Sequence, residues 1–139
     1  MEALIVVSII SILLTIAPFK STALSSFYEK RELREFKRDI EYARNRTIIE
    51  LNMYSIKIYP SQNTYTINNH GSTGRQVVKK KVFSKGIKIK STNIKDNEIP
   101  FSFTGHPFNS GTIVLEDSQG REIEITVSLA TGKVNIAYR

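Results

Sequence analysis

The feature that most constrains this chain is an uncharged, strongly apolar run at residues 3–19. Its only polar side chains are three hydroxyls, which can bond back to carbonyl oxygens of a helix. Such a segment is compatible with a transmembrane helix. A secretory signal peptide usually has a basic start and a small-residue cleavage site, whereas Glu2 precedes this run and no such site follows it. We therefore expect the segment to remain on the mature protein.

A second helical pattern, rich in charge, follows after a short Ser/Thr-rich joint. Apolar residues recur mostly at three- and four-residue steps over residues 24–51, which predicts a helix with one apolar stripe. Pro18 removes one backbone hydrogen bond and predicts a kink between the two halves. The simplest expectation is one long helix over residues 2–52. The stripe comprises Leu24, Phe27, Leu33, Phe36, Ile40, Ala43, Thr47, Ile48 and Leu51.

Opposite charges stand at helical spacings outside the stripe. The pairs are Arg31 with Glu35, Lys37 with Glu41, and Glu41 with Arg44. Each is expected to contribute about 0.2–0.5 kcal/mol if exposed, so the pairs favour solubility more than stability.

The remaining residues, 53–139, have room for one small globular domain. The absence of cysteine excludes disulfides, thiolate metal sites and cysteine nucleophiles. The hydrophobic period changes here from 3.6 to 2, as Tyr54, Ile56 and Ile58 alternate with polar neighbours. A turn at 60–63 and a strand at 64–68 complete a hairpin, and residues 68–74 read as a loop.

The later alternations predict a series of further short strands. They lie near residues 76–83, around Ile87 and Ile89, over 99–103, and over 112–116, 121–129 and 133–138. Pro100 is expected at a strand start or at a sheet edge. About eight strands in all predict an α+β protein whose helix stripe packs on antiparallel strands, arranged as a sandwich or as two small sheets.

Positive charge is concentrated in the strand-rich part. The net charge is +7, and no acidic residue occurs between Glu50 and Asp96. Such a concentration favours polyanions. A solvated basic face is the competing interpretation, because exposed aromatic residues do not interleave with these charges as in many single-strand binders. The candidate DNA-contact residues are Arg75, Lys79, Lys80, Lys81, Lys85, Lys88 and Lys90.

Motifs for chemistry are missing. His70 and His106 stand in separate Gly-containing loops, so no metal site is expected from them. Glu116 and Asp117 with Gly120 raise the possibility of a Ca²⁺ site, but the acidic ladder of such loops is absent and a solvated turn is favoured. No nucleophile elbow, phosphate loop or dinucleotide fingerprint occurs. We expect neither an enzyme nor a cofactor.

Two stretches resemble known proteins. Residues 1–14, MEALIVVSIISILL, with Pro18 downstream, resemble the N-terminal helix of type IV pilins and pseudopilins, in which a glutamate opens the hydrophobic segment. Residues 101–115 and 123–136 are similar to the minor competence pseudopilins of Gram-positive bacteria, the ComGD family, and more distantly to GspH-type pseudopilins of type II secretion. The resemblance implies a pilin-like fold, with a long helix on a C-terminal domain of two small antiparallel sheets.

The resemblance also implies a role for Glu2 in assembly. In the family this acid pairs with the N-terminus of a neighbouring subunit inside the filament. A carboxylate at the start of a membrane helix can instead lie in the headgroup layer, at the favourable end of the helix dipole. Family members carry a basic leader that a prepilin peptidase removes, followed by methylation of the new amine. Here that amine is expected upstream of Met1.

The function implied is that of a minor pilin-like subunit of a competence filament, which supports DNA binding and uptake in natural transformation. The implied partners are other major and minor pseudopilins, the membrane, prepilin peptidase and DNA. The implied location is the cell membrane and surface pilus of a Gram-positive bacterium, with the C-terminal domain outside. A type II secretion pseudopilin, an adhesive minor pilin and a generic membrane-anchored β domain are the alternatives.

Overall fold

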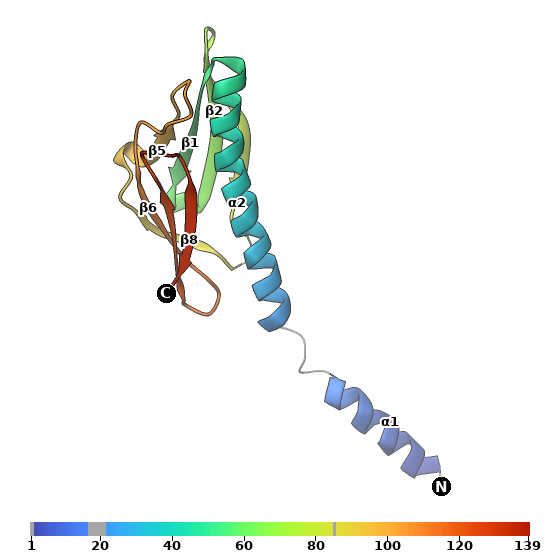
Figure 1. Ribbon diagram of the computed structural model, residues 1–139. Coiled ribbons are helices and arrows are strands. Elements are labelled where there is room, and N and C mark those ends of the chain that lie inside the picture. Colours follow the sequence, from blue (N-terminus) through green and yellow to red (C-terminus); the bar gives the residue numbers. More distant parts are fainter. Residues whose placement is uncertain (1, 17–21, 85) are drawn as a thin grey trace.

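The computed structural model describes residues 2–16, 22–84 and 86–139 (Figure 1). Helix α1 spans Glu2–Ile16, and helix α2 spans Thr22–Glu50. The predicted helical stretch is thus helical on both sides of residues 17–21, and the predicted kink at Pro18 lies outside the described residues. Neither described helix is both long enough and apolar enough to cross a membrane.

The strands of the described residues form two four-stranded antiparallel sheets. The first sheet has the order β3-β2-β1-β5, and the second has the order β4-β6-β7-β8. This confirms the prediction of two small sheets. The strands of the first sheet are β1 (Met53–Tyr59), β2 (Thr64–Gly71), β3 (Gly74–Val82) and β5 (Glu98–Pro100). Those of the second are β4 (Lys88–Thr92), β6 (Gly111–Glu116), β7 (Glu122–Val127) and β8 (Val134–Tyr138). The described residues also include two short 3₁₀ turns, η2 (Pro60–Gln62) and η3 (Lys95–Asn97).

The predicted loop at residues 68–74 is wrong for most of its length. Strand β2 continues to Gly71 and β3 starts at Gly74, so that only Ser72 and Thr73 remain as the turn. Gly74 has a φ of 103°, which suits glycine and lets the chain reverse here. The backbone N–H and C=O groups of these polar residues form hydrogen bonds with the neighbouring strand. Because unpaired backbone groups are costly, this pairing outweighs a composition that is typical of loops.

The predicted strand at 99–103 is shorter than expected. Pro100 ends β5, which is an edge strand as the proline required. Phe101 still donates its amide to the Tyr54 carbonyl over 3.0 Å, but beyond β5 it forms an isolated bridge to Pro107, and Phe103 is exposed. The chain curls back on itself instead, since the Ser102 amide donates to the His106 carbonyl over 2.8 Å.

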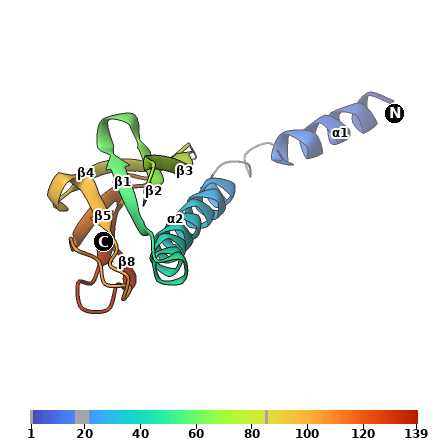
Figure 2. The same ribbon diagram turned by 90° about the horizontal axis from the view of Figure 1, so that it is seen from above.

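Helix α2 packs beside both sheets, nearest to β1 and β8 (Figures 1 and 2). The middle of its stripe is buried, whereas Leu24, Phe27, Ile48 and Leu51 at the two ends are exposed. Phe36 lies at the centre of an aromatic cluster, with ring centroids 4.5 Å from Tyr65 and 5.5 Å from Phe83. The buried part of the stripe consists of Leu33, Phe36, Ile40, Ala43 and Thr47. One core thus serves the helix and both sheets.

Asn63 joins the two sheets through its side chain. It follows η2 with a φ of 51°, a left-handed conformation that asparagine tolerates. Its Nδ2 donates to the carbonyls of Phe83 and Ile87 over 2.9 and 2.8 Å. Its Oδ1 accepts from the Ile89 amide of β4 over 2.7 Å. The turn of the first sheet is thereby bonded to the chain that enters the second.

We expect Asn63→Gly to lower the free energy of unfolding by roughly 2–3 kcal/mol, because it removes three hydrogen bonds of about 1 kcal/mol each. Glycine keeps the left-handed backbone accessible, so the change reports on the side chain. The free energy of unfolding is measured by urea denaturation of the full chain in mild detergent, monitored by circular dichroism. The neighbouring exposed Gln62→Ala serves as the control and should change stability by less than about 0.5 kcal/mol. Equal effects of the two variants would contradict this role of Asn63.

Candidate functional site

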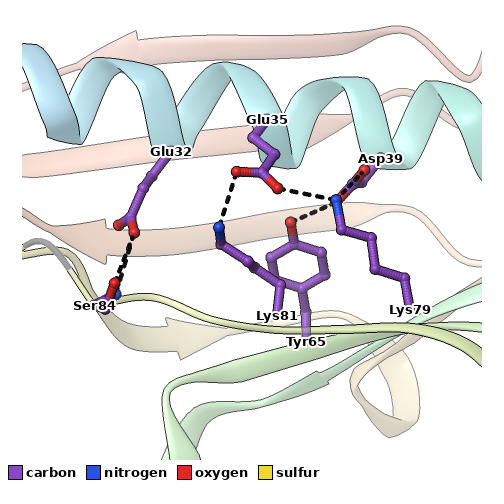
Figure 3. A network of polar contacts seen from close by, with 7 residues as sticks. All are labelled: Glu32, Glu35, Asp39, Tyr65, Lys79, Lys81 and Ser84. Atoms are coloured by element: carbon purple, nitrogen blue, oxygen red, sulfur yellow. Dashed lines mark hydrogen bonds and ion pairs between the residues drawn. The ribbon is translucent and has the colours of Figure 1, made fainter.

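A network of opposite charges joins α2 to β3. Glu32, Glu35 and Asp39 follow one another at three- and four-residue steps, which places them on one face of α2 (Figure 3). Lys79 and Lys81 are two residues apart on β3 and therefore share a face of the strand. The Lys79 ammonium lies 2.9 Å from Glu35 and 2.8 Å from Asp39, and the Lys81 ammonium lies 3.0 Å from Glu35. The network ties the edge strand to the helix.

Neutral donors extend this network in both directions. The hydroxyl of Tyr65 donates to Asp39 over 2.6 Å, and its buried ring lies against Phe36. Burial and the bonded carboxylate of Asp39 raise the pKa of Tyr65, so the hydroxyl stays protonated as a donor. At the other end Glu32 accepts from the amide and hydroxyl of Ser84, over 3.3 and 3.2 Å. This polar seam, which comprises Glu32, Glu35, Asp39, Tyr65, Lys79, Lys81 and Ser84, runs along α2 (Figure 3), and the Tyr65 ring joins it to the aromatic cluster.

The ion pair between Glu35 and Lys79 shifts the pKa of each partner toward its charged form. Hydrogen bonds from Lys79 and Lys81 lower the pKa of Glu35. Burial by itself would lower the pKa of Lys79, but the hydrogen bonds to Asp39 and Glu35 outweigh it and raise that pKa. Glu35 and Asp39 are therefore each paired with a lysine of β3.

Two adjoining cavities, of about 440 and 250 Å³, lie along the same seam. Arg31 and Glu35 line both of them, so the two hollows are neighbours along α2. We call this concavity the α2–β3 groove. It is lined by Tyr28, Arg31, Glu32, Arg34, Glu35, Arg38, Asp39, Lys79, Lys81 and Ser84. Sequence reasoning missed the groove, because no local pattern indicates which helix face meets β3.

Three of the candidate DNA-contact residues are neighbours on β3 but have different surroundings. Lys79 and Lys81 turn toward α2 and are held by its carboxylates (Figure 3). Lys80 lies on the opposite face of the strand, paired in register with Thr66, and is exposed. The lysine run is therefore split between two faces of the sheet.

The other candidate DNA-contact residues are further apart. Arg75 is the second residue of β3, and its guanidinium lies 3.3 Å from the Glu98 carboxylate. Lys88 and Lys90 belong to β4 of the second sheet, where two carboxylates hold Lys90. Lys85 lies outside the described residues. The six described members thus form no single patch, and their contact with DNA stays a prediction.

Glu2, the predicted assembly residue, is the first residue of α1. Its side chain lies outside what the structure describes, as does Pro18. The role of Glu2 in assembly therefore stays a prediction.

A second polar cluster lies on the other face of the first sheet. The buried Ser55 hydroxyl donates to Glu98 over 2.6 Å, and its oxygen lies 2.9 Å from His70 Nε2. Since Ser55 has one proton and gives it to Glu98, His70 must be the donor in the second bond. His70 is therefore not placed to activate Ser55 as a nucleophile. The cluster binds β1, β2 and β5 together and gives no sign of catalysis.

In the turn that the sequence offered as a possible Ca²⁺ site, Asp117 forms hydrogen bonds to the turn itself. The Asp117 carboxylate accepts from the amides of Gln119 and Arg121, each over 2.9 Å, and from the Arg121 guanidinium over 2.7 Å. Burial would raise the pKa of Asp117, but these bonds outweigh it and lower that pKa. The Asp117 carboxylate oxygens thus stabilise the turn between β6 and β7 through hydrogen bonds. Within the described ranges no three His, Asp or Glu residues are grouped to hold a metal.

The comparisons with known proteins identify the architecture. No family model matches the chain, and no curated protein matches it. Among solved structures, the minor pseudopilin EpsH from the Type 2 Secretion System of Vibrio cholerae matches with a TM-score of 0.63 and 10% identity. The match covers 78% of this chain and 95% of that one. The chain has a pilin-like fold. This confirms the expected fold class.

The lowered pKa of Glu35 predicts a pH-dependent contribution to stability. A carboxylate whose pKa is lower in the folded state stabilises above its unfolded pKa of about 4.3, and this contribution disappears as pH falls through the folded value. We expect Glu35→Gln to reduce stability at pH 7 by about 1 kcal/mol. The difference from the wild type should vanish near pH 3, as urea denaturation at both pH values would measure.

Glu41→Gln is the matched control for this experiment. Glu41 lies on the same helix, but its ion pair with Lys37 is 4.0 Å long and both side chains are well exposed. Glu41→Gln should lower the free energy of unfolding at pH 7 by less than Glu35→Gln does. A Glu35→Gln difference that is equal at both pH values would refute the charged network.

Proposed function

We propose that this chain is a minor pilin-like subunit of a competence filament, which supports DNA uptake during natural transformation. The observation that carries the proposal is a pilin-like fold joined to an apolar helix that begins with Glu2. The resemblance of residues 101–115 and 123–136 to minor competence pseudopilins favours competence over other pilus-like machines.

Helix α1 suits a subunit that moves from a membrane into a filament. The apolar side chains described in α1, within residues 3–12, are exposed, and α1 stands away from the sheets (Figure 1). The Ser8 hydroxyl donates to the Leu4 carbonyl over 2.7 Å, so this polar group is satisfied within the helix. Burying a Leu or Ile side chain contributes about 1.5–3 kcal/mol. The exposed set includes Leu4, Ile5, Val6, Val7, Ile9, Ile10 and Ile12.

In this proposal lipid covers α1 before assembly and neighbouring pseudopilins cover it afterwards. Glu2 then needs a cation inside an apolar surrounding, which a neighbour's N-terminal amine would supply. Prepilin peptidase would prepare that amine. The β domain would face outward from the membrane and from the filament core.

A second candidate is a minor pseudopilin of type II secretion. The likeness to EpsH, a protein of that system, favours it. An adhesive minor pilin is a further alternative within the same architecture. All three share a role for Glu2 in assembly, so the assay must report the process that the filament serves.

The test is natural transformation in strains that carry Glu2→Ala, a deletion of the gene, or the wild type. We expect Glu2→Ala to reduce transformation to the deletion level, because the variant cannot pair with a neighbour's amine although its helix remains apolar. Immunoblots of membrane fractions establish that the variant persists. Glu41→Ala, on α2, is the matched control and should transform normally.

Normal transformation of the deletion strain would refute the competence role. Secretion and adhesion assays on the same strains would then decide between the alternatives.

A further inference from the structure

We propose that the α2–β3 groove binds the phosphate backbone of a single-stranded DNA segment, through Arg31, Arg34 and Arg38. This inference rests on the proposed function and names the place where the subunit would meet DNA. The site differs from the basic residues of the strand-rich part that the sequence suggested.

The three arginines share one face of α2. They stand at i, i+3 and i+7, which is the spacing of neighbours along a helix. All three are exposed at the mouth of the groove. Seven residues of helix rise about 10 Å, and one stacked strand carries about three phosphates over that length. The row therefore matches a run of successive phosphates.

Their guanidinium groups are available for a ligand. No ion pair engages Arg31, Arg34 or Arg38 within the described part of the chain. The nearby carboxylates that could neutralise them are already taken. Glu35 bonds to two lysines of β3, and Asp39 bonds to Lys79 and to Tyr65.

The groove is also positive as a whole. Its lining includes five cations and three carboxylates, the lysines lying beside the acids and the arginines at the exposed rim. Arginine presents a planar fork of donors that matches a phosphate. A nucleic-acid strand offers several phosphates in a row, so that three arginines can each neutralise one and the affinity depends on salt.

The experiment uses the full chain in nanodiscs of uncharged lipid. Fluorescence anisotropy measures its binding to a labelled 20-nucleotide single strand between 50 and 200 mM salt. The test variant is R31Q/R34Q/R38Q. We expect its affinity at 50 mM salt to fall at least tenfold. The slope of log affinity against log salt should fall by about 2, since each phosphate that an arginine no longer neutralises lowers it by about 0.7.

The control variant, K80Q/K88Q/K95Q, removes the same charge from exposed lysines outside the groove. It should keep most of the affinity and most of the slope. A third variant, R31K/R34K/R38K, keeps the charges and should keep the slope. Thermal unfolding of each variant by circular dichroism establishes that it is folded.

Equal weakening of the glutamine variants would overturn the inference, since binding would then follow net charge. Stronger weakening by K80Q/K88Q/K95Q would also overturn it, in favour of the basic strands. Tighter binding to a duplex, to polyglutamate or to vesicles of phosphatidylglycerol would overturn it as well, by assigning the groove to another ligand.

Failure of this inference can be told from failure of the proposed function. If R31Q/R34Q/R38Q binds DNA normally while Glu2→Ala abolishes transformation, the groove inference fails and the competence role stands. If the groove variant no longer binds DNA but the deletion strain transforms normally, the inference stands and the competence role fails.

Discussion

The burial of one apolar stripe of α2 against both sheets is the interaction on which the rest of the structure depends. Phe36 and Ile40 are fully buried, and Phe36 meets Tyr65 of the first sheet and Phe83 of the connection to the second. Neither sheet could bury its inner face alone, since four short strands leave one side uncovered. The helix therefore closes a core that the two sheets share, and its rotation about its own axis is fixed.

That fixed rotation decides the electrostatics of the surface. Once Phe36 faces the core, Glu35 and Asp39 stand beside β3, where Lys79 and Lys81 reach them. The same rotation places the arginines of α2 at the mouth of the groove. Glu35 and Asp39 of α2 are thus paired with lysines of β3, whereas the arginines of α2 remain at the exposed rim. The charges of α2 are nearly balanced in sequence, but the folded structure leaves a positive rim.

The two halves of the molecule have different requirements. The β domain and α2 share one core of buried apolar residues, whereas the described side chains of α1 present theirs outward. A surface of that kind is stable only when lipid or other helices cover it. This contrast, together with the pilin-like fold, is the physical basis for the proposal that the protein assembles into a filament. The polar clusters around Ser55 and Asp117 hold strands and turns in place.

The sequence by itself determined the elements whose signals are local. The 3.6-residue period located α2, the alternation after Asn52 located most strands, and Pro100 marked an edge, because periodicity and missing donors act within a few residues. Only the tertiary structure decided which charges meet. Glu35, four residues from Arg31, bonds instead to lysines more than 40 residues away. The hairpin that replaced the loop at 68–74 and the α2–β3 groove have the same origin. Each depends on strand register and helix rotation, which the packing of the whole core sets and no short stretch of sequence encodes.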